Sequence, residues 1–239
     1  MATVDSYGMV KALTTGNTTI TAQLEDEDLS ASCSLTVTTP AAAPADALGG
    51  LFSVSDNKVV RFAKSNLCRK SDGSYIFFDN QYNMAQGEEE TELVTWGKVS
   101  DCLSSSNDQV WRTLSADEWM YLFGNNEFRK GLYAKHVTVV GVADCVIIYP
   151  DGYAGTKVTD ENRTTLYDDS DTWTQARKDG VVCLTPVVEF KGATINYWID
   201  SESILRVYSI GGSTPDLSIW YLYGPETTTH ASRPVTEVK

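Results

Sequence analysis

The stretch that says most about the fold runs from residue 111 to residue 123 and reads Trp-Arg-Thr-Leu-Ser-Ala-Asp-Glu-Trp-Met-Tyr-Leu-Phe. Ser115-Ala116-Asp117-Glu118 has the serine and glutamate spacing of a capping box, in which each side chain bonds the backbone N–H of the other residue. Trp119, Leu122 and Phe123 then follow at i, i+3 and i+4, so they share one face of a helix. The sequence therefore predicts a helix that begins after Ser115 and buries an aromatic face.

The rest of residues 49–239 reads as one further helix among short strands. Residues 171–178 predict the second helix, and Gly180 follows it at the position that glycine favours after a helix end. Two nearly continuous apolar runs, residues 146–149 and 181–184, predict central strands that are buried on both faces. Two helices among many short strands indicate an α+β domain.

Residues 1–38 read as a separate β module. Residues 18–22 and 34–38 are short, rich in threonine and alternating, which is typical of half-buried strands. The acidic run at residues 25–28 is most simply a solvated hairpin tip, and a calcium site there is the alternative. Residues 39–48 are rich in proline and alanine, which predicts a linker.

Both parts of the chain contain blocks that match known families. In the N-terminal module the blocks are Ala2–Asp5, Gly8–Ala12, Gly16–Ala22 and Cys33–Val37. In order and spacing they resemble the second half of a bacterial Ig-like group 2 domain whose opening strands are missing.

In residues 49–239 the blocks are Gly50–Ser55, Val59–Leu67, Phe77–Tyr82, Trp111–Phe123, Ile147–Tyr153, Gly180–Leu184, Asn196–Trp198 and Ser232–Val235. Together they resemble a C-type-lectin-like family common in Bacteroidetes and their phages, which includes the variable proteins of diversity-generating retroelements.

This resemblance implies a C-type-lectin-like fold with a C-terminal variable segment, carried over as residues 196–233, that forms a ligand-binding face. Two stretches depart from the family pattern, Leu184-Thr185-Pro186 and Ile199-Asp200-Ser201-Glu202. Both lie close to the expected ligand face. Diversification and ordinary drift are equally compatible with these departures.

Rigid aromatic side chains mixed with small polar ones are typical of recognition surfaces. The segment contains such a mixture, and we expect Tyr221 and Tyr223 to face the ligand, with Trp198 and Leu222 in the core. The position of Trp220 is left open between the core and the ligand face. The predicted ligand-binding residues are Asp200, Ser201, Glu202, Ser203, Arg206, Tyr208, Trp220, Tyr221, Tyr223, Thr228 and His230.

Several other functions find no support in the sequence. The formal net charge of −13 disfavours nucleic acid and anionic membranes as partners. The five cysteines include no closely spaced pair, which argues against zinc and redox motifs and favours small buried side chains, with one disulfide left open. No catalytic motif accompanies the two histidines, His136 and His230, so we expect no enzyme, no metal and no cofactor.

The leading hypothesis is a non-catalytic protein of a bacterial surface or a phage virion that binds a cell-surface protein or glycan. A fixed adhesin or a structural pilus module is the alternative, and a homo-oligomer is compatible with both. Residues 1–5 lack the features of a signal peptide. Either a longer precursor supplies the export signal, or lysis releases the protein, as it does for phage proteins. No stretch is apolar enough to insert into a membrane.

Overall fold

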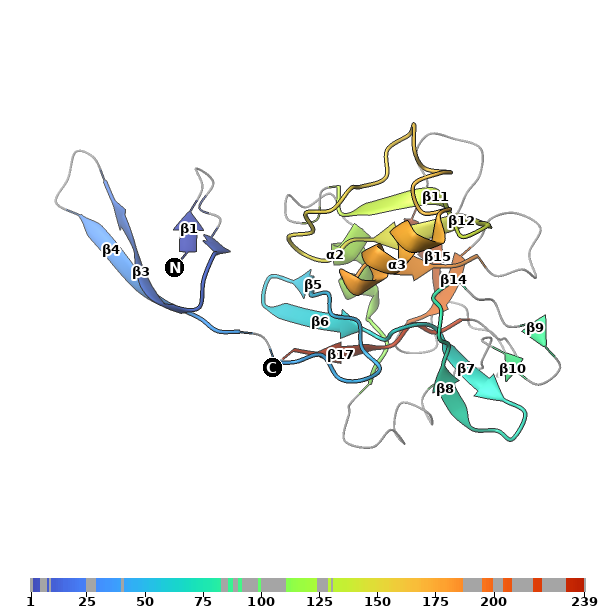
Figure 1. Ribbon diagram of the computed structural model, residues 1–239. Coiled ribbons are helices and arrows are strands. Elements are labelled where there is room, and N and C mark those ends of the chain that lie inside the picture. Colours follow the sequence, from blue (N-terminus) through green and yellow to red (C-terminus); the bar gives the residue numbers. More distant parts are fainter. Residues whose placement is uncertain are drawn as a thin grey trace. The chain divides into compact units, whose positions relative to one another are not determined.

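The computed structural model describes residues 2–4, 8, 10–24, 29–39, 41–82, 86–87, 90–91, 99, 111–123, 129, 131–186, 195–199, 204–207, 217–220 and 231–238. The chain divides into two compact units, Met1–Ala41 and Ala42–Val238 (Figure 1). The division falls inside the stretch that the sequence predicts as a linker.

The N-terminal unit consists of two antiparallel strand pairs. Strand β1 (Ala2–Val4) pairs with β2 (Val10–Ala12). Strand β3 (Gly16–Gln23) pairs with β4 (Ser30–Val37) in an unbroken register from Gly16 opposite Val37 to Gln23 opposite Ser30. None of the side chains described in residues 2–39 is buried. The threonine-rich segments are strands, as predicted.

The second half of the predicted linker is part of the larger unit. The backbone N–H of Leu48 donates to the carbonyl of Phe62 over 2.8 Å, and that of Lys64 donates to the carbonyl of Asp46 over 2.7 Å. Leu48 is buried in the main core. Residues 46–48 therefore extend the structure around residues 62–64 instead of acting as a spacer.

The middle of the larger unit is an antiparallel sheet in the order β11 (Tyr133–Val139), β12 (Val142–Ile148) and β13 (Val182–Leu184). Alternate residues of β12 and β13 enter two different hydrophobic clusters. Val146, Ile148, Val182 and Leu184 belong to one cluster, and Cys145, Ile147 and Cys183 belong to the other. This burial on both faces explains the continuous apolar runs, which the sequence correctly predicts as buried strands.

A second sheet pairs the C-terminal strand of the larger unit with two strands near its beginning. Its order is β17 (Val235–Glu237), β6 (Lys58–Phe62) and β5 (Phe52–Ser55). Helix α2 (Ala116–Phe123) packs on β5. Trp119 contacts the ring of Phe62 at 5.9 Å and stacks on Phe123 at 5.7 Å between ring centroids.

Two further sheets complete the described strands. One has the order β8 (Tyr75–Phe77), β7 (Leu67–Lys70), β10 (Glu90–Thr91) and β9 (Gln86–Gly87). The other has the order β14 (Ile195–Trp198), β15 (Ile204–Val207) and β16 (Leu217–Trp220).

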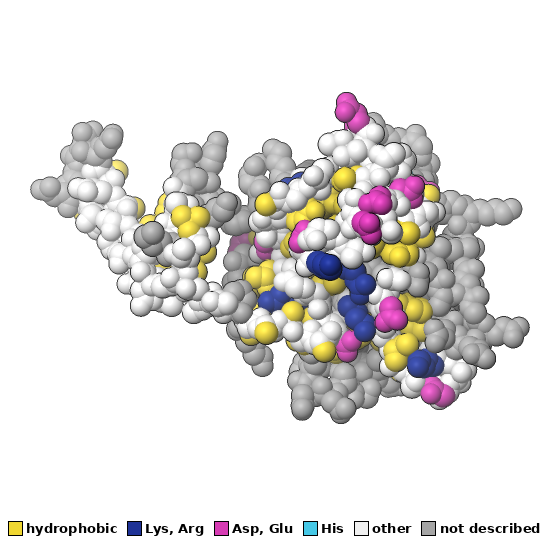
Figure 2. Space-filling model, in the orientation of Figure 1, with side chains coloured by type: hydrophobic (Ala, Val, Ile, Leu, Met, Phe, Trp, Pro, Cys, Tyr) yellow, Lys and Arg dark blue, Asp and Glu magenta, His cyan; other side chains and the backbone are white. Residues whose placement is uncertain are grey.

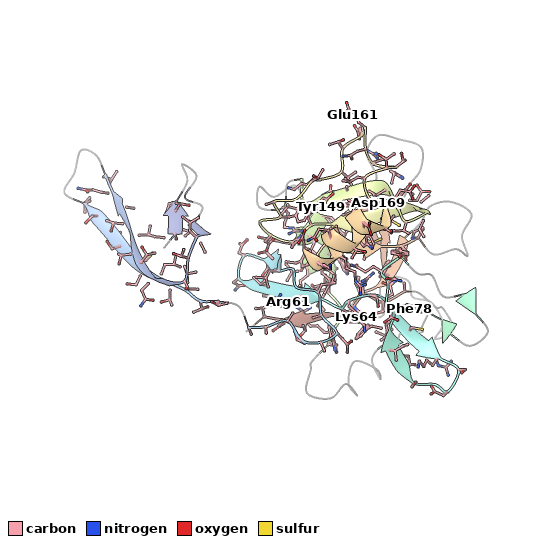
Figure 3. All side chains as sticks on the ribbon, viewed as in Figure 1. Arg61, Lys64, Phe78, Tyr149, Glu161 and Asp169 are labelled. Atoms are coloured by element: carbon pink, nitrogen blue, oxygen red, sulfur yellow. The ribbon has the colours of Figure 1, made fainter. Side chains whose placement is uncertain are left out.

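Helix α2 begins after Ser115, and helix α3 ends before Gly180, as the sequence predicts. In α2, Ser115 N donates to Glu118 Oε2 over 2.9 Å, and Glu118 N donates to Ser115 Oγ over 3.2 Å, so the capping box is confirmed. Helix α3 (Ser170–Lys178) begins after the N-cap Asp169, labelled in Figure 3. At its other end Gly180 has φ +88°, and Gly180 N and Val181 N donate to the carbonyls of Arg177 and Ala176. This pair of bonds is a Schellman motif.

The predicted α+β class with a C-type-lectin-like domain is wrong. The described residues form small sheets with two short helices, of 8 and 9 residues, so the class is largely β. Helices of this length span only about 12–14 Å. They cover parts of sheet faces and do not build a helical layer. No described helix is both long and apolar enough to cross a membrane.

Candidate functional site

The segment predicted to bind ligand, residues 196–233, contains the antiparallel sheet β14–β15–β16. Its register places Asn196 opposite Arg206 and Arg206 opposite Ser218. One step along the strands, Trp198 lies opposite Ile204, which in turn lies opposite Trp220. The pair of Tyr197 and Leu205 lies between these two rows, so it belongs to the other alternating set of positions.

Tyr197 fastens the start of this segment to the core. Its side chain is fully buried, and its hydroxyl accepts hydrogen bonds from Asn66 Nδ2 over 2.9 Å and from Thr185 N over 3.1 Å. Tyr197 also forms a parallel bridge with Ala231. A buried tyrosine hydroxyl usually requires such partners. The bonds fix β14 against the end of β13.

Arg233 fastens the end of the same segment. Its side chain is 1% exposed. Nε donates to Asn66 Oδ1 over 2.8 Å, Nη1 to Gln81 Oε1 over 3.1 Å, and Nη2 to the carbonyl of Cys183 over 2.6 Å. A buried guanidinium loses its hydration, so these fixed acceptors are needed to hold it.

Asn66 and Gln81 connect the two fastenings. Asn66 bonds both Tyr197 and Arg233. Gln81, which also bonds Arg233, donates from Nε2 to the carbonyl of Val181 over 2.9 Å and accepts from Cys183 N over 2.9 Å. The two ends of the predicted binding segment are thus joined through one buried polar network, which we call the anchor network: Asn66, Gln81, Tyr197 and Arg233.

The sequence alone does not predict the anchor network as a functional element. Each of its four residues lies in a block that carries the family resemblance. The sequence carries no specific signal, because Asn66 follows Lys64 and Ser65 and Arg233 follows Ser232, so both stand beside other polar residues. Sequence alone could not pair them, because Asn66 and Arg233 are separated by 167 positions.

A second polar cluster attaches the C-terminal strand to helix α2. Arg112 forms a two-pronged ion pair with Glu118, with distances of 2.6 and 2.8 Å, and its Nε lies 3.3 Å from Glu237. Burial raises the pKa of Glu118, but hydrogen bonds from Arg112 and Ser115 outweigh that effect and hold the pKa below the ordinary carboxyl value. The backbone of Arg112 also pairs with Val235.

Most of the predicted ligand-binding residues lie outside the described residues. The structure places two of them: Arg206 lies in β15 and Trp220 lies in β16, at the register positions given above. Those outside the described residues are Asp200, Ser201, Glu202, Ser203, Tyr208, Tyr221, Tyr223, Thr228 and His230.

An open hollow of about 490 Å³ lies beside the end of α3, lined by residues 49–51, residues 150–155 and Asp179. The carboxylate of Asp151 is already engaged at both oxygens. Arg129 Nη1 donates to Oδ1 over 2.6 Å, and Ser53 donates to Oδ2 from its backbone N–H over 2.6 Å and from its hydroxyl over 2.7 Å. Asp151 therefore acts as a structural partner of the buried Arg129.

The described cysteines are free thiols with different environments. Cys68, Cys145 and Cys183 are buried, as predicted, but Cys33 is exposed. A hydrogen bond with Cys183, together with burial, raises the pKa of the Cys145 thiol well above its ordinary value. A protonated thiol is a poor nucleophile. Cys102 lies outside the described residues.

His136 lies in β11, and its Nδ1 is 3.1 Å from Asp144 Oδ1. Within the described part of the chain, no group of three or more histidine, cysteine, aspartate or glutamate side chains is placed to hold a metal ion. In comparisons with known proteins, no family model, no curated protein and no solved structure matches this chain.

Proposed function

We propose that this chain is a non-catalytic ligand-binding protein of a bacterial surface or phage virion, and that the sheet β14–β15–β16 carries its recognition face. The observation that carries the proposal is the anchor network. It holds Tyr197 and Arg233, at the two ends of the segment, through the shared side chain of Asn66. A segment held at both ends by buried polar contacts tolerates sequence change between them.

The register defines which positions form the recognition face. Successive residues of a strand lie on opposite faces of a sheet. Tyr197 belongs to the core set. The opposite set consists of Asn196, Trp198, Ile204, Arg206, Ser218 and Trp220. In this proposal Trp198 moves from its predicted place in the core to the recognition face, where Trp220 and Arg206 supply residue types common at binding hot spots. The proposal takes Trp220, in place of Tyr221 and Tyr223, as the aromatic contact of this strand; the two tyrosines lie outside the described residues.

The similarity to variable proteins of diversity-generating retroelements belongs to the same proposal. It implies that the ligand is a cell-surface protein or glycan and that the recognition positions differ between copies of the gene. The net charge of −13 favours a ligand that is not itself strongly acidic.

A mutational scan of stability tests the proposal without a known ligand. Every residue described in β14, β15 and β16 is substituted, the variants are displayed on yeast, and resistance to protease is measured. We expect Asn196, Arg206 and Ser218 to accept most substitutions and Tyr197 to accept few. Equal intolerance of the two sets would contradict the recognition face.

Sequencing of the 3′ end of the gene in its source population tests the diversification. Substitutions should gather in codons 196–233, and the codons of Tyr197 and Arg233 should stay constant. Variation no higher there than in codons 50–190 would leave a fixed adhesin or structural module as the better account.

A further inference from the structure

The β3–β4 hairpin has two chemically opposite faces. One consists entirely of hydroxyl and amide side chains, and Thr21 Oγ1 lies 2.8 Å from Ser32 Oγ on it. The other, which we call the hairpin apolar face, carries no group more polar than a hydroxyl or thiol. Its residues are Gly16, Thr18, Ile20, Ala22 and Leu24 on one side and Leu29, Ala31, Cys33, Leu35 and Val37 on the other.

The hairpin apolar face is covered at one end only. Thr18, Ile20, Leu35 and Val37, near the open end of the hairpin, are half-buried. Toward the tip, Ala22, Ala31 and Cys33 are exposed, and Leu24 and Leu29 are each 59% exposed. Figure 2 shows hydrophobic side chains at the surface of this unit. A two-stranded hairpin with an open apolar face is only marginally stable in water, so burial of this face stabilises the unit.

The distribution of charge indicates which partner can cover the hairpin apolar face. The strands Gly16–Gln23 and Ser30–Val37 contain no charged residue, although 21% of the chain is charged and its net charge is −13. Two copies of so acidic a chain repel each other over most of their surface. An uncharged apolar face is the surface at which they approach with the least repulsion, and it is complementary to itself.

We propose that the tip half of the hairpin apolar face packs against the same face of a second copy of this chain. The contact has two-fold symmetry, as most contacts between identical chains do. The hairpins run antiparallel to each other. That arrangement separates the two runs of four acidic residues at positions 25–28, which a parallel arrangement would bring together. Cys33 of each copy then lies within the interface.

The size of the face sets the strength of the association. A two-stranded hairpin of eight residues per strand is about 27 Å long and 10 Å wide, so its tip half covers about 135 Å² per copy. Stable complexes bury about 800 Å² per partner. The dimer is therefore weak.

Sedimentation velocity over about 5–500 µM measures this association, with a monomer mass of 26.3 kDa. The mass of the unmodified chain should rise toward twice that value. Ala22→Lys puts a charge on the hairpin apolar face and should weaken dimerisation at least about tenfold. Gln23→Lys adds the same charge at the next residue on the polar face, so it should change dimerisation less than about twofold. A constant mass of 26.3 kDa, or equal effects of the two variants, would overturn the proposal.

Cross-linking through Cys33 gives a second measurement, made in a Cys102→Ser background. Diamide takes one hydrogen from each of two Cys33 thiols, a disulfide forms between the copies, and the azo group of diamide is reduced to a hydrazine. A covalent dimer should appear on a non-reducing gel, Cys33→Ser should abolish it, and Ala22→Lys should make it form at least about tenfold more slowly. A dimer that persists in Cys33→Ser, or that forms as fast in Ala22→Lys as without that substitution, contradicts a contact at this face.

Discussion

At the scale of single residues, the most informative side chain is a buried cation. Arg233 donates to a side-chain oxygen of Asn66, one of Gln81 and the carbonyl of Cys183. Removing the guanidinium takes a donor from three buried acceptors, of which Gln81 Oε1 keeps a second donor in Cys183 N. Each buried acceptor left unsatisfied costs about 1–3 kcal/mol. The cost of substituting Arg233 should therefore exceed that of a typical surface change several times over.

We expect Arg233→Met to lower the free energy of unfolding by about 3 kcal/mol or more. Urea denaturation measures the change. Arg177→Met, at a partly exposed arginine of α3, is the control and should cost less than about 1 kcal/mol. Similar losses in the two variants would show that the anchor network contributes little.

Glu118 should make stability depend on pH. Its pKa in the folded chain is lowered, against the effect of burial, by hydrogen bonds from Arg112 and Ser115. A lowered folded pKa stabilises the fold above the unfolded carboxyl pKa of about 4.3, and this contribution is lost as pH falls through the folded pKa. Glu118→Gln should therefore be less stable than the unmodified chain at pH 7, and the difference should shrink toward pH 3.

Urea denaturation at pH 7, 5, 4 and 3 follows that difference. Asp117→Asn, an exposed carboxyl in the same helical turn, controls for the general loss of a charge near the helix N-terminus. A Glu118→Gln deficit that stays constant over this range would contradict the assignment.

The sequence predicts only the local part of the polar cluster around Glu118. The spacing of Ser115 and Glu118 predicts their reciprocal bonds, because a capping box is local. The bonds from Glu118 to Arg112 and from Arg112 to Glu237 depend on how the C-terminal strand returns to the helix. The anchor network is hidden from sequence for the same reason, since Gln81 and Cys183 are 102 positions apart.

At the scale of elements, two glycines determine how helix α3 joins the sheet region. A Cβ on Gly180 would lie 2.3 Å from Gly50 N and 2.4 Å from Gly50 Cα, so the two backbones are in direct contact. Gly180 also has φ +88°. The sequence correctly predicts Gly180 as the helix end, but it gives no sign of the contact with Gly50.

Gly180→Ala should lower the free energy of unfolding by at least about 3 kcal/mol, through a clash added to a left-handed backbone. Gly73→Ala is the matched control, because Gly73 has φ +84° but open space around it. It should cost only about 1–2 kcal/mol. Chemical denaturation compares the two variants, and equal costs would mean that the contact between Gly50 and Gly180 is readily relaxed.

The error in fold class also arises at the scale of elements. Both helices exist where the capping and periodicity signals place them, yet they are too short to form a layer. Local signals report that an element exists, but not how much of the fold it supplies. The apolar runs of β12 and β13 were the better guide, because burial on both faces requires covering structure on both sides of the sheet.

At the scale of the whole molecule, the boundary of the larger unit lies earlier than composition suggests. Proline and alanine between residues 39 and 48 predict a spacer, but Leu48 is 5% exposed and lies in the main core. A single leucine at the end of a linker-like stretch carries no periodic pattern, so its burial was not visible in the sequence. The structure begins the larger unit at Ala42.

Two truncated chains, starting at residues 42 and 49, test this boundary. The shorter one loses the burial of Leu48, worth about 1.5–3 kcal/mol, and two backbone hydrogen bonds to residues 62 and 64, worth about 0.5–1.5 kcal/mol each. For a unit of this size, each kcal/mol shifts the melting temperature by about 2–4 °C. Differential scanning calorimetry should therefore find the chain that starts at residue 49 melting about 10 °C below the other. Identical melting temperatures would return residues 42–48 to the role of a spacer.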